Sequence, residues 1–285
     1  MTHKLLVVTY TPDLTQFAMF CHCLAKNWKG NKDLIVVAGK GTDVDRVQQI
    51  CQTYLDHTWQ VAIKHTIPTQ LSGDQEQQLN KIIYSVQSGA TDVIVFDSKD
   101  FLLRACDLGA FKIGNRYKHT YRLPGKLVNL GYDLDQIVNQ PVAHLPAVSN
   151  LTPWIWNTQQ LEACWQHMID QFGPCEQWSS FNVVSEIYMY YIYVLTTKPN
   201  PLEFCLQSQT PCLFAGGWTG QTGAGMMEQA QLFAQHNDAI VWKHSRKLQD
   251  PLCLYVTRRV LQQQGIDPAV IQKIYDPAVI QKIYG

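Results

Sequence analysis

Two aspartates, Asp97 and Asp100, follow the apolar run Val93–Phe96, with Lys99 between them. The run predicts a buried strand, and ligands collect at the carboxyl ends of strands in open α/β sheets. Two carboxylates at such an edge offer oxygen ligands of the kind that Mg²⁺ or Mn²⁺ prefers, and such an ion can hold a diphosphate. This spacing makes Asp97 and Asp100 candidate metal ligands, and Lys99 could neutralise a phosphate.

Glu186 is a second carboxylate with a chemical signature, because it lies in the apolar stretch 183–189. Burial among apolar side chains raises the pKa of a carboxyl group unless the group is paired, which suits a general base for an acceptor hydroxyl. A partly exposed acid, or a structural hydrogen bond to Tyr190, is at least as well supported by the same residues.

Gln78 and Lys81 lie three positions apart within the predicted helix 73–87, so they share one helix face. That face could reach a phosphorylated ligand, or it could be the solvated side of the helix. Late in the chain, Lys243 and Arg246 flank His244. These cations could lie along a diphosphate, whereas a plain basic surface explains them equally well.

The elements that must position these residues alternate between strand and helix, which indicates right-handed crossovers and a mostly parallel sheet. Strands are predicted at 5–10, 34–37, 61–65 and 92–96, and helices at 14–26, 43–54 and 73–87. We therefore predict an α/β fold with a Rossmann-like half over 1–105. A more helical acceptor half follows over 106–266, with helices at 157–172 and 182–195. Residues 267–275 recur verbatim as 276–284, which indicates a duplicated tail over 267–285.

Composition narrows the class of protein further. The 285 residues are 46% hydrophobic and 16% charged, so long disordered stretches are not expected, and the net charge of zero argues against a surface that binds nucleic acid everywhere. Nine cysteines without a CxxC pair indicate reduced thiols and a cytoplasmic location. The apolar run at 5–8 is too short for a membrane span. Gly39-Lys-Gly41 matches neither a dinucleotide nor a P-loop fingerprint, which leaves metal-assisted binding of a nucleoside diphosphate.

Each of two further segments has two possible interpretations. Residues 112–126 contain five basic side chains, no acid and interleaved aromatics, which fits either a solvated hairpin or a surface for a phosphate-bearing partner. Trp154 and Trp156 follow Pro153 and could stack on a sugar or base, or could belong to the core.

Together these motifs resemble a GT-A glycosyltransferase, in particular the small bacterial and phage group labelled DUF6492. Residues 7–13 resemble its opening strand and loop, which hold the nucleotide. Residues 74–81 are similar to its QQxxK helix, and 96–104 to its DSD-plus-FLR segment. Residues 185–190 resemble its SExxxY helix, and 242–246 its late HxR segment. This chain departs from the DxD pattern at Lys99.

The resemblance implies transfer of a sugar from a nucleotide-diphosphate sugar to an acceptor hydroxyl. Mn²⁺ or Mg²⁺ would be held by Asp97, Asp100 and His244, and Glu186 and Asp97 would be catalytic. The implied donor contacts are Thr9, Tyr10, Asp13, Gln78, Lys81, Lys99, Lys243 and Arg246. A hydroxymethylated base in phage DNA, positioned through 112–126, is one expected acceptor.

Other assignments stay open on the sequence. The acceptor could instead be a glycan or a small molecule, and the departure at Lys99 keeps a non-catalytic nucleotide-sugar-binding protein in view. A nucleotidyltransferase is disfavoured, because Thr9–Asp13 stands where a glycine-rich loop would follow the first strand.

Overall fold

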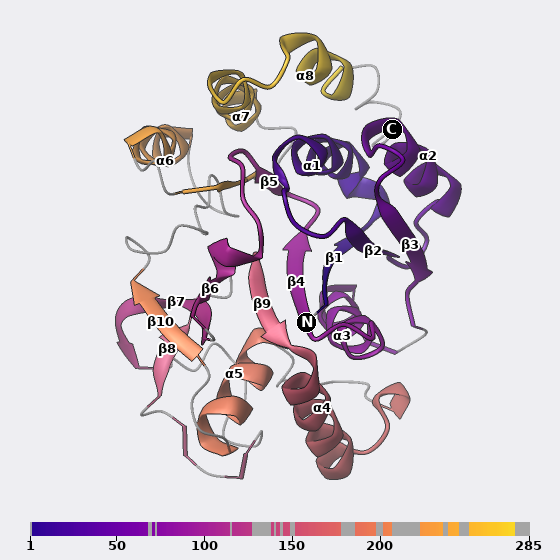
Figure 1. The fold of residues 1–285 in the computed structure, drawn as a ribbon, viewed down its shortest axis with the longest axis vertical. Helices are drawn as coiled ribbons and strands as arrows, with labels where there is room; N and C mark the ends of the chain where they lie inside the picture. The colour runs from indigo at the N-terminus through magenta and orange to yellow at the C-terminus, as the bar shows by residue number, and fades with distance from the viewer. Residues whose placement is uncertain are drawn as a thin grey trace.

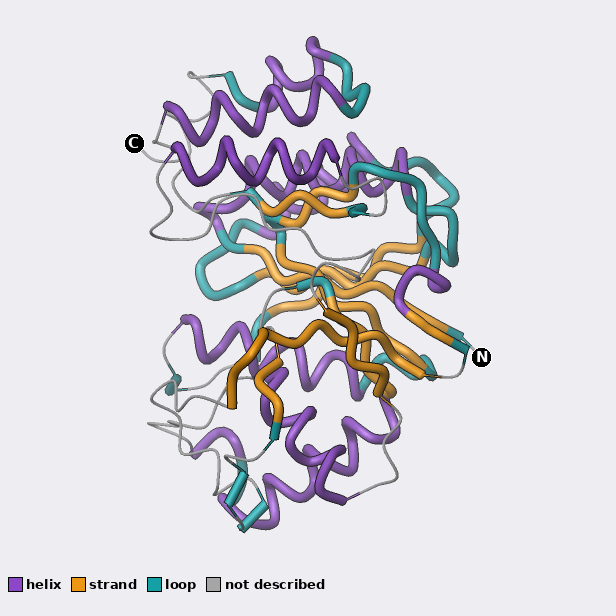
Figure 2. The backbone as a smooth tube through the Cα atoms, turned by 90° about the vertical axis from the view of Figure 1, so that its left-hand side faces the viewer, coloured by secondary structure: helices purple, strands orange, loops and turns teal. Residues whose placement is uncertain are grey.

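A five-stranded sheet runs through the middle of the protein, with helices on both of its faces (Figures 1 and 2). The strand order is β3-β2-β1-β4-β9. These strands span His3–Thr9 (β1), Asp33–Ala38 (β2), Gln60–His65 (β3), Asp92–Asp97 (β4) and Trp154–Asn157 (β9). Strands β1 to β4 pair in parallel, and β9 is antiparallel to β4. The structure is a computed structural model that describes residues 2–67, 70–71, 73–114, 116–126, 138–139, 141–142, 145–148, 152–177, 186–197, 202–206, 223–235, 239–244 and 251–276.

Three helices connect the parallel strands: α1 (Leu14–Asn27), α2 (Val44–Tyr54) and α3 (Gly73–Val86). The alternating strands and helices predicted for this half are confirmed, as is the mostly parallel sheet. The register places Val8 of β1 beside Asp97 of β4 and Thr9 beside Ala38 of β2. The loops that follow these strands therefore begin at one edge of the sheet.

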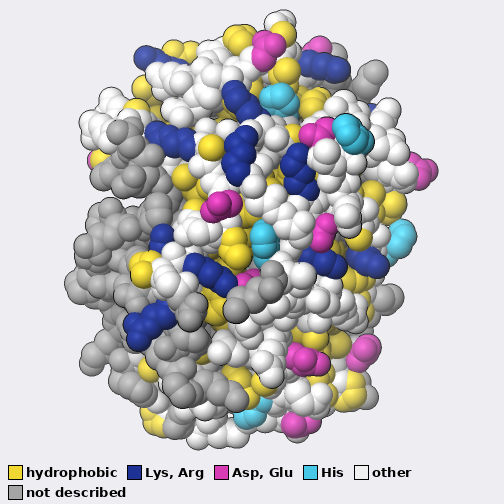
Figure 3. Space-filling model, in the orientation of Figure 1, with side chains coloured by type: hydrophobic (Ala, Val, Ile, Leu, Met, Phe, Trp, Pro, Cys, Tyr) yellow, Lys and Arg dark blue, Asp and Glu magenta, His cyan; other side chains and the backbone are white. Residues whose placement is uncertain are grey.

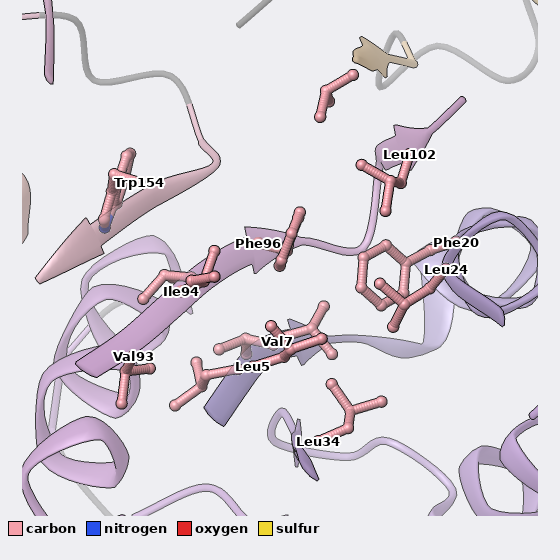
Figure 4. Packing of buried hydrophobic residues seen from close by; sticks show 14 of the residues in the cluster. Leu5, Val7, Phe20, Leu24, Leu34, Val93, Ile94, Phe96, Leu102 and Trp154 are labelled. Atoms are coloured by element: carbon pink, nitrogen blue, oxygen red, sulfur yellow. The ribbon is translucent and has the colours of Figure 1, made fainter. Parts of the chain in front are cut away.

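The core explains why the strands are continuous apolar runs. Both faces of the sheet are covered along its inner strands, so their side chains are buried, whereas the edge strand β3 has no fully buried side chain. Residues 5–8 of β1 and 93–96 of β4 are fully buried, and Phe20 and Leu24 of α1 pack against them (Figure 4). Full burial of one such side chain contributes roughly 1.5–3 kcal/mol.

The second half of the chain contains helices α4 (Thr158–Phe172) and α5 (Glu186–Thr197). The helix expected at 157–172 is confirmed, and so is the described part of the one expected at 182–195. A four-stranded sheet accompanies them, with β6 (Lys112–Ile113), β7 (Arg116–Lys126), β8 (Pro146–Val148) and β10 (Leu202–Leu206). Strand β9 joins the sheet of the first half, so the two halves share one sheet.

The remaining elements are a two-stranded sheet, three helices late in the chain and short 3₁₀ helices. Strands β5 (Asp100–Leu102) and β11 (Val241–Lys243) pair antiparallel, and helices α6 (Gly223–Gln235), α7 (Pro251–Gln263) and α8 (Pro268–Ile274) follow. Short 3₁₀ helices span Thr11–Asp13, Leu108–Phe111 and Cys175–Gln177. No helix of the described residues is both long and apolar enough to cross a membrane.

The first copy of the repeat lies within the fold, which corrects the expected tail. It forms α8, which packs against α1 (Figure 1) and buries Ile271, Ile274 and Tyr275. The spacing of these apolar residues matches one face of a helix, and this gives the segment a surface to bury. The second copy, from residue 277 on, lies outside the described residues.

Surface charge and thiols follow from composition. Basic and acidic side chains are interspersed on the face shown in Figure 3, as the zero net charge predicts. The seven cysteines whose side chains are described are buried and form no disulfide. Burial raises the pKa of the Cys23 and Cys164 thiols, so these groups are unreactive core residues.

Candidate functional site

The candidate site lies at the carboxyl edge of the parallel sheet, where the loops after β1, β2 and β4 meet. Thr11 N donates a hydrogen bond to Thr42 Oγ1 at 3.1 Å, which joins the first two loops. Lys99 Nζ lies 2.5 Å from Asp13 Oδ2, which joins the loop after β1 to the turn after β4. Asp97 ends β4 at this same edge, as the sequence predicted.

Asp97, the last residue of β4, is held by two lysines. Lys81 Nζ from α3 lies 2.8 Å from Asp97 Oδ1, and Lys243 Nζ from β11 lies 2.6 Å from Oδ2. Burial opposes ionisation of Asp97, but the charges and hydrogen bonds of the two lysines outweigh it and hold its pKa well below the usual value. The side chain of Asp97 is 23% exposed, against 5% for Lys81 and 6% for Lys243.

Lys243 also ties Asp97 to Asp100. Its Nζ lies 3.0 Å from Asp100 Oδ1 and 2.7 Å from Thr152 Oγ1, because the antiparallel register of β5 and β11 sets Lys243 beside Asp100. Asp100 Oδ2 accepts a hydrogen bond from Asp97 N at 2.8 Å. Burial raises the pKa of Asp100 despite the positive charge of Lys243.

Glu186 is paired with a lysine. It lies in the first turn of α5, is 4% exposed, and its Oε1 is 3.0 Å from Lys81 Nζ. Tyr190 OH instead donates to Gln160 Oε1 at 3.0 Å. Burial disfavours the charged form of Lys81, but Asp97 and Glu186 together raise its pKa above the usual value. We refer to Lys81, Asp97, Asp100, Glu186 and Lys243 as the lysine–carboxylate cluster.

His244 lies apart from the two aspartates. Its ring is stacked on Phe101, with centroids 5.9 Å apart, and lies 5.9 Å from the ring of Tyr275. Its Nδ1 is 2.9 Å from Thr257 Oγ1, while its Nε2 is buried without a hydrogen-bond partner in the described structure. Burial and the charge of Lys99 lower its pKa to about 3, so the ring is neutral at pH 7.

Asp97, Asp100 and His244 are not placed so that all three could hold one divalent cation. Successive side chains of a strand point to opposite faces, so Asp100 faces Lys243 whereas Phe101 faces His244. The oxygens of Asp97 and Asp100 are already bonded to lysines or to backbone N–H. Within the described residues, no group of three or more His, Cys, Asp or Glu could hold a metal ion.

The other predicted donor contacts are spread around this edge. Thr9 is fully buried, and its hydroxyl has no hydrogen-bond partner in the described structure. Tyr10 donates from its OH to Gly73 O at 3.2 Å, and its ring covers Gly39 so closely that a Cβ there would lie 2.0 Å from it. Gln78 is half-buried on α3. Arg246 lies outside the described residues.

The predicted stacking platform is wrong. Trp156 is fully buried and Trp154 is 5% exposed, so both rings belong to the core, which was the competing interpretation. They pack against each other with centroids 6.3 Å apart, and Lys81 Nζ lies 5.2 Å from the Trp154 ring. The Trp154 ring therefore packs against Lys81 of the lysine–carboxylate cluster instead of facing a ligand.

The basic segment 112–126 is partly engaged inside the protein. Lys112 Nζ lies 2.5 Å from Asp92 Oδ2, and the OH of the buried Tyr117 donates to Asp92 Oδ1 at 2.6 Å. Lys118 Nζ donates to Ala110 O at 3.2 Å, whereas Arg116 is exposed. Lys112 is thus a partly buried cation with a structural partner. The side chains from 119 to 126 lie outside the described residues.

Sequence reasoning missed Thr152, whose hydroxyl accepts a hydrogen bond from Lys243. No local pattern marks it, because the partner lies 91 positions away.

Comparison with known protein families finds no matching family, and comparison with curated proteins finds no matching protein.

Proposed function

We propose that this chain is a glycosyltransferase that moves a sugar from a nucleotide-diphosphate sugar to an acceptor hydroxyl. One observation carries the proposal: the five segments that resemble a GT-A enzyme meet at one edge of the sheet. These segments are joined by ion pairs between residues that lie up to 146 positions apart in sequence. The residues in these pairs are Asp13, Lys81, the charged residues of the Asp97–Asp100 turn, Glu186 and Lys243. A chance likeness of five short motifs would not require them to touch.

The GT-A assignment has support from the placement of these groups in the sheet. Ligands bind beyond the carboxyl ends of parallel strands. Here β1 and β4 are adjacent; Asp13 lies just after β1, and Asp97 ends β4. This edge is where a nucleotide would lie on an open parallel sheet.

The proposed reaction forms a bond between the acceptor oxygen and the anomeric carbon. The bond from that carbon to the diphosphate breaks, and its electron pair leaves with the diphosphate. Glu186 is the candidate that receives the acceptor proton. Asp97, ionised and partly exposed, can accept hydrogen bonds from hydroxyl groups of the donor. Lys99, with a side chain 11% exposed, is the cation nearest to solvent at the described turn.

The decisive experiment offers the protein UDP-, GDP-, CDP- and TDP-sugars and measures release of the nucleoside diphosphate. Assays with Mn²⁺, with Mg²⁺ and with EDTA run in parallel, with and without acceptors. Turnover of one donor that is lost in Asp97→Ala supports the proposal. Failure to turn over any donor under any of these conditions contradicts it.

A non-catalytic nucleotide-sugar-binding protein is the second candidate. The buried ion pairs of the lysine–carboxylate cluster satisfy one another, as they would in a purely structural cluster. Equilibrium binding of the same donors separates the two candidates, since a binding protein would retain the donor without cleaving it. The cytoplasmic location and the choice between DNA and glycan acceptors stay predictions.

A further inference from the structure

We infer that Asp97 acts as a lysine-held carboxylate and not as a metal ligand, with Lys81 and Lys243 occupying the place that a divalent cation would take. The inference rests on the proposed function only for the identity of the substrate. Whether lysines or a metal ion neutralise Asp97 is a property of the fold, and it can be tested without any substrate.

The geometry leaves each Asp97 oxygen facing one ammonium group. Lys81 approaches Oδ1 at 2.8 Å and Lys243 approaches Oδ2 at 2.6 Å, from elements on different parts of the chain. A metal ion bound at Asp97 would lie beside both ammonium groups, and their like charge would oppose it or drive one of them away. The displaced ammonium would stay nearly buried with less opposite charge around it, which is strongly unfavourable.

Charge counting leads to the same conclusion. The lysine–carboxylate cluster contains two ammonium groups and three carboxyl groups, and Asp13 and Lys99 form a separate neutral pair. Lys243 faces Asp97 and Asp100, and Lys81 faces Asp97 and Glu186, so every carboxyl group of the cluster faces an ammonium group. The cluster therefore already contains the positive charge that a carboxylate pair would otherwise recruit from a metal.

The exposed part of the cluster shows what it offers to a ligand. Asp97 is the member that reaches solvent, and each of its oxygens keeps a lone pair beyond the bond to lysine. A cluster with more carboxyl groups than ammonium groups does not attract a free anion, but an ionised carboxylate accepts hydrogen bonds from hydroxyls strongly. The chemical group that fits Asp97 is a ribose or sugar hydroxyl of the donor.

Mn²⁺ alone is the direct probe, with free Mn²⁺ measured by its electron paramagnetic resonance signal. We expect the wild type and Asp97→Asn to take up Mn²⁺ equally weakly. In Lys243→Met, Asp97 and Asp100 lose their shared ammonium, so Mn²⁺ should bind at least about tenfold more tightly than in the wild type and raise the Tm. Lys32→Met, which breaks the surface pair with Asp56, is the matched control and should gain no site.

Two results would overturn the inference: one Mn²⁺ bound per wild-type chain and lost in Asp97→Asn, or donor turnover that EDTA abolishes and Mn²⁺ restores. Turnover that persists in EDTA supports it. If Lys243→Met does not fold, the comparison of wild type with Asp97→Asn still shows whether Asp97 binds Mn²⁺. Absence of turnover with every donor contradicts the proposed function alone, since the Mn²⁺ titration is independent of it.

Discussion

Lys81 and Glu186 are 105 positions apart in sequence, yet the Lys81 ammonium lies 3.0 Å from the Glu186 carboxylate and 2.8 Å from that of Asp97. Helices α3 and α5 pack together and bring the two side chains into contact. Glu186 therefore helps to hold Lys81 against Asp97, whatever part it takes in proton transfer.

The first prediction is that Glu186→Gln and Lys81→Met act on one unit. Each change alone should lower donor turnover, and the double variant should be little worse than the poorer single variant. The coupling free energy should be about 0.5–3 kcal/mol, as for residues in direct contact. Turnover and urea unfolding of the four proteins give the cycle.

A matched control for this cycle is Glu162→Gln, which changes an exposed carboxylate on α4. It should leave both turnover and unfolding unchanged. Additive effects of Glu186→Gln and Lys81→Met would show that the pair does not work together. A pH profile of transfer that keeps its shape in Glu186→Gln would remove Glu186 as the base.

The second prediction concerns Asp97→Asn, which keeps the shape but removes the charge that faces two nearly buried lysines. Breaking a fully buried pair costs about 3–5 kcal/mol. Since Asp97 is 23% exposed and asparagine keeps one acceptor oxygen, we expect a loss of about 1–3 kcal/mol in unfolding free energy. Donor turnover should fall on the order of 10²-fold, as after loss of a charge-stabilising group.

Asp56→Asn is the control for that measurement, because Asp56 pairs with Lys32 on the surface at 3.5 Å. Exposed pairs contribute little, so its urea midpoint should not move measurably. An equal loss of stability in both variants would mean that the cluster at the sheet edge has no special energetic role.

The parallel sheet and its helices were predictable from local patterns, whereas the second sheet and the contacts of the site were not. Continuous apolar runs such as 5–8 and 93–96 indicate buried parallel strands, and the edge rule then places Asp97 correctly. The partners of Asp97 come from α3 and β11, and no local pattern encodes a contact across 146 positions. His244 faces Phe101 because of strand alternation in a pair, β5 with β11, that sequence reasoning did not identify.

The third prediction is a pH dependence that His244 causes. Burial lowers its native pKa to about 3, whereas an unfolded histidine titrates near 6.5. Between these values the unfolded chain binds one more proton than the native one. Stability therefore falls as pH decreases below about 6.5, by up to about 1.4 kcal/mol per pH unit. His244→Asn should remove this part of the slope.

Urea unfolding at pH 7 and pH 5 measures it, with the exposed His57→Asn as control. The loss of stability between the two pH values should be smaller in His244→Asn than in the wild type, and unchanged in His57→Asn. Identical losses in all three proteins would show that His244 titrates normally in the native state.

The fourth prediction concerns the close approach of Tyr10 to Gly39. A Cβ at residue 39 would lie 2.0 Å from the Tyr10 ring, so Gly39→Ala must displace that ring from the loop after β1. Overpacking of this kind costs about 1–3 kcal/mol. Gly73→Ala is the control, since a Cβ there meets nothing within 4 Å. If Tyr10 contacts the donor, only Gly39→Ala should weaken donor binding in equilibrium titrations.

The last prediction concerns a nucleic-acid acceptor on strand β7. Arg116 is exposed there, and Lys112 is bound to Asp92. If this strand contacts DNA phosphates, the affinity should fall with salt, with a slope of about −0.9 per phosphate neutralised. The triple change Arg116→Ala, Lys118→Ala and Arg122→Ala should then weaken binding and reduce the slope, while Lys112→Met should mainly destabilise the fold.

Fluorescence anisotropy with hydroxymethylated and unmodified duplexes, across a range of salt concentrations, measures both quantities. A control variant removes the exposed Lys29, Arg46 and Lys64 instead, which changes the net charge equally away from β7. Equal effects of the two triple variants would indicate only general electrostatic attraction. No binding at low salt would exclude a DNA acceptor. Because that result would not bear on the donor edge of the sheet, the search for an acceptor would then turn to glycans and small molecules.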